Sequence, residues 1–214
     1  MPKLKRRDII NIIPKNRRGQ SAKFGGIMYQ SIKELYNDVM SCSKCRLAKN
    51  RRTIVFGEGS IKADLMFIGE GPGQREDETG RPFVGPAGQL LDKMLEGIGL
   101  KRSDVYIANV VKCRPPNNRD PEEDERAQCI GYLRAQVAFI RPKIIVCLGR
   151  VAAGSILGRT VRMMREHGQP VKVKNFTILP TFHPAALLHN PDHRADAQAD
   201  FKVIEGLLRE HAHA

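Results

Sequence analysis

The sequence lacks a long apolar run, and this absence excludes a membrane-spanning helix. No stretch approaches the roughly 18 apolar residues that such a helix requires, and the basic N-terminus has no apolar segment of the signal-peptide kind. We therefore expect a cytoplasmic protein without a membrane partner. At 214 residues the chain is long enough for one α/β domain and short for two.

Acidic residues are also under-represented, with 23 acids against 36 Lys and Arg and a formal net charge of +13. Residues 1–27 hold eight basic side chains and one acid, Asp8. We expect a flexible basic extension over 1–27 and a single domain over 28–214. The extension accounts for +7, so the body still carries +6. A basic excess in both parts predicts a nucleic-acid partner.

Cysteine is scarce, and five thiols in a reducing compartment do not suggest a disulfide framework. Cys147 lies within an apolar run, so we expect it to be a buried hydrophobic residue. The other four form a C-x2-C pair followed by two single cysteines with 15 residues between them: Cys42, Cys45, Cys113 and Cys129. Four thiolates can close a metal site. Zinc, an iron–sulfur cluster and a set of unrelated buried thiols all remain open at this point.

Nearly continuous apolar runs predict four strands, at 65–69, 105–110, 143–148 and 176–181. Runs without alternation are typical of a parallel sheet that is covered on both faces. Helical spacing predicts helices over 30–40, 87–98, 121–140, 150–157 and 197–211. The alternation of strands and helices predicts a three-layer α/β/α sandwich with a central, mainly parallel four-stranded sheet.

A glycine-rich turn follows the first strand, within the segment GEGPGQREDETGRPFVGPAGQLLD at 69–92. Open α/β sheets bind ligands at the carboxyl ends of strands, so we expect a pocket here. Gly69, Gly71 and Gly73 allow the backbone to approach a ligand closely. Their G-x-G-x-G pattern is not a dinucleotide fingerprint, and Pro72 removes an amide that a phosphate would need. This disfavours a nucleotide-cofactor enzyme.

An acidic cluster in the same segment is unexpected in so basic a chain: Glu70, Glu76, Asp77 and Glu78. Any one of these residues could simply belong to a solvated loop. Together they would repel phosphate, yet they would stabilise a developing cation. Cleavage of an N-glycosidic bond leaves positive charge on the sugar, and carboxylates can stabilise that charge and orient the attacking water.

Three further residues have side chains suited to binding a base. Phe83 lies in a loop, where it could stack on a flipped base, although core packing is the alternative. Asn109 lies at the end of one predicted strand, and His183 follows the end of another. An asparagine amide offers a donor and an acceptor side by side, a pair that can bind the edge of a base.

The segment 69–92, the stretch NVVKCRPPNNR and the sequence FHPAALL after the last strand together resemble the family 4 uracil-DNA glycosylases over about residues 30–208. The resemblance implies a monofunctional repair enzyme that flips uracil out of single- or double-stranded DNA. It would hydrolyse the N-glycosidic bond and leave an abasic site. It also implies a structural [4Fe–4S] cluster on Cys42, Cys45, Cys113 and Cys129, with zinc as the alternative.

The resemblance implies a role for each site residue. Glu70 would stabilise the sugar cation and orient the water, and Glu76 and Asp77 are the next candidates for this role. His183 would stabilise the departing uracil anion. Residues that would bind the substrate are Gly71, Phe83, Asn109, Asn118 and Leu187, the last as an exposed wedge that enters the vacated base stack, a role that Leu188 could also take. We expect a monomer in the cytoplasm, associated with the nucleoid, with repair or replication proteins as candidate partners. The main alternative is a non-catalytic metal-cluster DNA-binding module or polymerase accessory.

Overall fold

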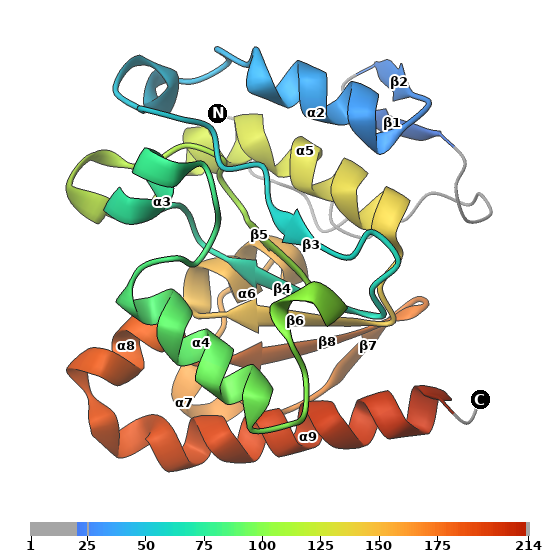
Figure 1. The fold of residues 1–214 in the computed structure, drawn as a ribbon, viewed down its shortest axis with the longest axis vertical. Helices are drawn as coiled ribbons and strands as arrows, with labels where there is room; N and C mark the ends of the chain where they lie inside the picture. The colour runs from blue at the N-terminus through green and yellow to red at the C-terminus, as the bar shows by residue number, and fades with distance from the viewer. Residues whose placement is uncertain (1–20, 25, 213–214) are drawn as a thin grey trace.

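A six-stranded sheet forms the centre of the computed structural model, which describes residues 21–24 and 26–212 (Figure 1). The strand order is β3-β5-β4-β6-β8-β7. The four inner strands are parallel, and they are β5 (Tyr106–Asn109), β4 (Leu65–Gly69), β6 (Ile144–Leu148) and β8 (Phe176–Thr181). These are the four strands predicted from the sequence, so the mainly parallel α/β architecture is confirmed.

Two short strands widen the sheet beyond the four that were predicted. β3 (Glu58–Gly59) and β7 (Val171–Val173) pair antiparallel at the two edges. β3 is two residues long, and β7 places an exposed lysine between two half-buried valines. Neither segment contains an apolar run, which is why the sequence pattern did not reveal them.

The helices form the two outer layers, and alternate residues of each strand face one layer or the other. Leu65 and Phe67 pack with residues of α4 (Pro86–Glu96) and α9 (Arg194–Ala212). Met66 and Ile68 pack on the opposite side with α5 (Glu123–Ile140) and α6 (Arg150–Leu157). None of the helices in the described part of the chain is long and apolar enough to cross a membrane.

The remaining helices lie around these layers. α2 (Ile32–Met40) packs on α5, and α8 (Pro184–His189) packs on α4. The shorter elements are α3 (Gln74–Thr79), α7 (Met163–Glu166), η1 (Arg46–Lys49), η2 (Arg102–Asp104), η3 (Pro116–Asn118) and η4 (Pro191–His193).

An antiparallel hairpin precedes α2 and packs on α5. It consists of β1 (Ala22–Phe24) and β2 (Ile27–Tyr29), and both Ala22 and Tyr29 are buried. The hairpin therefore begins before residue 28, where the domain was predicted to start. Most of the predicted basic extension, residues 1–20, lies outside the described residues.

Candidate active site

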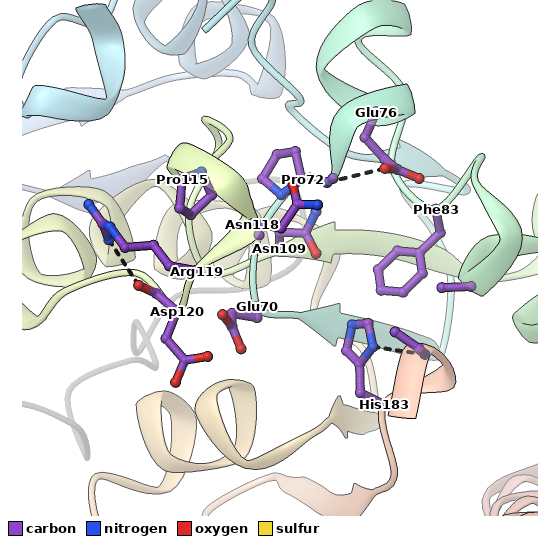
Figure 2. Close-up of a pocket in the computed structure, with 14 residues that line it drawn as sticks. Glu70, Pro72, Glu76, Phe83, Asn109, Pro115, Asn118, Arg119, Asp120 and His183 are labelled. Atoms are coloured by element: carbon purple, nitrogen blue, oxygen red, sulfur yellow. Dashed lines mark hydrogen bonds between the residues drawn. The ribbon is translucent and has the colours of Figure 1, made fainter. Parts of the chain in front are cut away.

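A pocket of about 310 Å³ opens at the carboxyl ends of β4, β5 and β8 (Figure 2). The register of the sheet pairs Gly69 at the end of β4 with Asn109 at the end of β5. Seven of the residues that the sequence placed in the site line this pocket: Glu70, Gly71, Glu76, Phe83, Asn109, Asn118 and His183. Parallel strands thus bring together segments that are more than 100 residues apart in the chain.

The amide of Asn109 is the most informative group in the pocket. Asn109 is only 1% exposed, and its Oδ1 has no hydrogen-bond partner among the residues that the structure describes. Buried polar atoms are rarely left unsatisfied in folded proteins. A Cβ atom on Gly69 would lie 2.4 Å from this Oδ1 and 2.6 Å from Phe83 Cζ. Gly69 therefore lets the amide and the aromatic ring meet at one point, where a ligand can satisfy the oxygen.

Phe83 is held in an unusual backbone conformation at the pocket wall. It has a φ of 52° and is 6% exposed, and its ring centroid lies 5.6 Å from that of His183. Arg102 donates hydrogen bonds to the carbonyl oxygens of Pro82 (2.7 Å) and Phe83 (3.0 Å). A Cβ on Gly88 in α4 would lie 1.8 Å from the Phe83 carbonyl oxygen. These contacts fix the backbone at Phe83, and the ring itself lines the pocket.

His183 is neutral and carries its proton on the nitrogen that remains available to a ligand. The residue caps the N-terminus of α8, where its Nδ1 accepts a hydrogen bond of 3.1 Å from the Ala185 N–H. An Nδ1 that accepts leaves the proton of a neutral ring on Nε2. Burial lowers the pKa of His183 to about 4. At neutral pH the ring is therefore an uncharged hydrogen-bond donor.

Glu70 shares the other end of the pocket with Asp120 (Figure 2). Burial is the largest cause that raises the pKa of Glu70, and the charge of the Asp120 carboxyl and a shared hydrogen bond act in the same direction, so the pKa is about 7. The positive charge of Arg150, which pairs with Asp120, acts in the opposite direction on the pKa of Glu70. The sequence analysis missed Asp120, because an exposed acid after a loop of polar residues carries no distinctive pattern.

Glu76 lines the pocket, but its carboxylate is already engaged by the backbone. It accepts hydrogen bonds from the N–H groups of Gly73 (3.1 Å), Val84 (2.8 Å) and Gly85 (2.8 Å). The carboxylate therefore connects the glycine turn to the loop that carries Phe83. Glu76 shapes the pocket wall in this structure.

Asp77 points away from the pocket, so the expectation that it faces the sugar is wrong. The residue is 3% exposed, and its carboxylate accepts from the backbone N–H groups of Arg52 (3.0 Å) and Thr53 (3.4 Å). Both Glu76 and Asp77 belong to α3, where neighbouring side chains diverge by about 100° around the helix axis. The two adjacent acids therefore bind the backbone of two different segments.

The last two predicted substrate contacts have different outcomes. Asn118 is exposed at the pocket, and its Oδ1 accepts from Arg114 Nε at 2.8 Å. Leu187 is 1% exposed and packs with Phe182 and Ala197, so the expectation of an exposed wedge at this position is wrong. Its neighbour Leu188 is 39% exposed. The turn of α8 directs the first leucine inward and the second outward.

The four predicted metal ligands lie around one small cavity between α2, η1 and α5: Cys42, Cys45, Cys113 and Cys129. The Lys112 backbone N–H donates to Cys129 Sγ, and Arg51 Nη1 donates to Cys113 Sγ, both at 3.3 Å. As the chain stands, no group of three or more His, Cys, Asp or Glu within the described residues is arranged to hold a metal ion. A set of four thiols with N–H donors on sulfur nevertheless fits the requirements of an iron–sulfur cluster.

The fold and the pocket together define a base-excising glycosylase. Its features are a buried amide whose oxygen no described group satisfies, an aromatic wall, a neutral imidazole donor and the paired carboxyls of Glu70 and Asp120. The family model described as the uracil DNA glycosylase superfamily matches residues 56–205.

Comparison with individual proteins narrows the assignment. A type-4 uracil-DNA glycosylase of Sulfurisphaera tokodaii is 47% identical over 186 residues, which cover 83% of this chain and 84% of the relative. That of Archaeoglobus fulgidus is 45% identical over 183 residues, or 82% of this chain and 92% of the relative. That of Thermotoga maritima is 47% identical over 154 residues, or 71% and 80%.

The chain belongs to the type-4 uracil-DNA glycosylases. This confirms the family predicted from the sequence motifs and the prediction of a DNA-repair enzyme that excises uracil.

Proposed function

We propose that the pocket at the strand ends is where this chain cleaves the N-glycosidic bond of a deoxyuridine extruded from DNA. The observation that carries the proposal is the buried Asn109 Oδ1, which lacks a partner and lies beside the Phe83 ring. A flipped base stacked on Phe83 would bring its hydrogen-bonding edge to this amide.

Asn109 would distinguish uracil from cytosine by hydrogen-bond pattern. Uracil N3–H donates to Oδ1, and uracil O4 accepts from the amide nitrogen. Cytosine presents a lone pair at N3 and a donor at its exocyclic nitrogen, so both contacts become repulsive. Sites that satisfy a buried polar group only with the correct substrate discriminate by about 10⁴-fold or more.

His183 would stabilise the leaving group. When the bond between C1′ and N1 breaks, its electron pair goes to the base, and negative charge develops on uracil N1 and O2. A hydrogen bond from the neutral Nε2–H strengthens as that charge grows, so it favours the transition state over the bound substrate. Because the pKa of His183 is about 4, the ring supplies this donor across the neutral range without being protonated.

Glu70 would act on the sugar side. Its carboxylate stabilises the cationic sugar and accepts a proton from the water whose oxygen forms the new bond to C1′. A pKa of about 7 places Glu70 near the value that suits a general base at neutral pH. Asp120 contributes by raising that pKa, and it adds a second negative charge when it is ionised.

The test is an excision assay on an oligonucleotide with a single deoxyuridine, followed by hot alkali. We expect strand cleavage at the uracil position and none in the matched oligonucleotide that contains deoxycytidine. An intact strand after incubation would contradict the proposed function and favour the non-catalytic DNA-binding module.

We further propose that Cys42, Cys45, Cys113 and Cys129 hold a structural [4Fe–4S] cluster. The cavity between these thiols and the N–H donors to two of them support this assignment. The cluster would tie α2 and η1 to α5 and leave the chemistry to the pocket. Iron and acid-labile sulfide at about four per chain, with broad absorption near 400 nm, are expected. Zinc without iron would contradict the cluster.

The remaining proposals concern the molecule as a whole. We propose that residues 28–214 act as one catalytic domain, to which β1 is added by its pairing with β2, and that the rest of residues 1–27 is a basic extension. The net charge of +13 suits uracil-containing DNA, single- or double-stranded. We propose a monomer that acts in the cytoplasm on the nucleoid, together with repair or replication proteins.

A further inference from the structure

A second groove, of about 300 Å³, runs between α5 and α6 and ends at residues 158–161. Four arginines line it, and they are Arg126, Arg134, Arg150 and Arg159. Glu123 is the only acid among the described residues that line the groove. A concentration of guanidinium groups along two packed helices is a site suited to an anion.

The groove adjoins the active site. Arg150 lines the groove and pairs with Asp120, which lines the catalytic pocket. The positive charges of Arg150 and Arg126 both lower the pKa of Glu70, so both guanidinium groups lie within electrostatic reach of that carboxyl. A ligand in the groove would therefore lie directly beside a nucleotide in the pocket.

Arg126 carries the strongest indication of an external partner. Its side chain is half-buried, and within the described residues no ion pair joins it to a carboxylate. Arg159, at the other end of the groove, pairs with Glu166. Withdrawing a cation from water without an anion is unfavourable, so the groove gains stability when an anion enters it.

The charges of the catalytic pocket decide where the DNA backbone can pass. Glu70 and Asp120 repel phosphate at the mouth, yet the strand that carries the extruded nucleotide must continue past it. An arginine-lined groove begins beside Asp120, at Arg150. We propose that the groove between α5 and α6 binds a phosphodiester of the uracil-containing strand next to the flipped nucleotide.

This inference rests on the proposed excision of uracil from DNA, and it adds a binding site for the flanking backbone. Arginine suits the role because its planar fork can bind two phosphate oxygens at once. The site reads no sequence, so it should contribute equally to every uracil context.

The test uses the full chain and a fluorescent oligonucleotide with a single 2′-fluoro-deoxyuridine, which resists cleavage. We expect Arg126→Gln and Arg159→Gln each to weaken binding by about tenfold, as for a lost hydrogen bond to a charged group. Each should reduce the slope of log K against log salt by about 0.7 on single-stranded DNA. Arg209→Gln is the matched control, since Arg209 lies on α9 and pairs with Glu205; it should bind as the wild type does.

A neutral-backbone scan on the wild-type protein tests the same proposal without relying on a folded variant. Single methylphosphonates are placed at each position on both sides of the uracil. We expect a methylphosphonate at one flanking position to weaken binding by the wild type strongly. The same methylphosphonate should have little further effect on binding by Arg126→Gln. If no position and neither substitution changes affinity while the wild type excises uracil, the groove assignment is wrong and the proposed function stands.

The last experiment measures the binding of inorganic pyrophosphate, because a free anion could bind to the same arginines. If calorimetry shows tight pyrophosphate binding that is lost in Arg126→Gln while DNA affinity is unchanged, the groove belongs to a free ligand and the backbone proposal is overturned. Absence of uracil release by the wild type in the same samples would instead contradict the proposed function.

Discussion

The catalytic pocket and helix α3 both contain buried or half-buried polar side chains, but they use them in opposite ways. In the pocket, Asn109 Oδ1 has no partner and the pKa of Glu70 is raised by burial. In α3, the carboxylates of Glu76 and Asp77 accept several backbone N–H groups. Buried polar groups that the protein satisfies stabilise the fold, whereas the Asn109 oxygen, which no described group satisfies, can be satisfied by a substrate. Substitutions in the two regions should therefore affect different measurements.

The largest effect is expected for Glu70→Gln, which removes the proposed base. We predict a fall in single-turnover rate of about 10²- to 10⁴-fold on a uracil oligonucleotide. A residual rate within threefold of wild type would contradict the role of Glu70.

The same substitution should stabilise the folded protein at alkaline pH. In the folded protein the pKa of Glu70 is about 7, above its ordinary value of 4.5, so the ionised carboxylate opposes folding at alkaline pH. The penalty is full above pH 7 and disappears below about 4.5, where both states are protonated. We therefore expect Glu70→Gln to melt at a higher temperature than wild type at pH 8, with the difference vanishing near pH 4. A lower melting temperature of the variant at pH 8 would contradict the raised pKa of Glu70.

A substitution in α3 should lower the stability of the fold and leave the excision rate nearly unchanged. Asp77→Asn weakens the bonds to the Arg52 and Thr53 amides, and we predict a loss of about 1–3 kcal/mol in the free energy of unfolding. Denaturant titration measures this loss, and single-turnover kinetics below the melting transition should change by less than threefold. A large rate loss with unchanged stability would move Asp77 back among the catalytic residues.

A smaller effect is expected for Asp120→Asn, which lies at the border of the pocket. Removing this carboxylate eliminates an influence that raises the pKa of Glu70 and leaves Arg150 to lower it. The acid limb of the kcat/KM profile should therefore shift to lower pH. If the acid limb of the profile does not shift, a group other than Glu70 determines it.

The sequence predicted the inner strands and most of the pocket, but it did not predict the direction of every side chain. The parallel strands and the ends that carry Glu70, Asn109 and His183 were predictable, because continuous apolar runs mark buried strands and parallel strands end at one edge. Leu187 and Asp77 were misplaced because their directions depend on how α8 and α3 are rotated against the core. Spacing alone cannot distinguish Leu187 from Leu188 when the helix containing them is not predicted.

Other features had no signal in the sequence. Asp120 became visible as a site residue only when the fold placed it beside Glu70. The edge strands β3 and β7 are too short to show periodicity. The arginines of the second groove come from α5, α6 and the segment after α6, so their proximity depends on helix packing.

The central claim is that the unsatisfied amide of Asn109 reads the base in the pocket. The most direct test compares kcat/KM for matched deoxyuridine and deoxycytidine oligonucleotides in the wild type and in Asn109→Asp. We predict that the preference for uracil falls by several orders of magnitude in the variant, because its carboxylate repels O4 and accepts from the cytosine amino group. An unchanged ratio in a folded, DNA-binding variant would contradict the account.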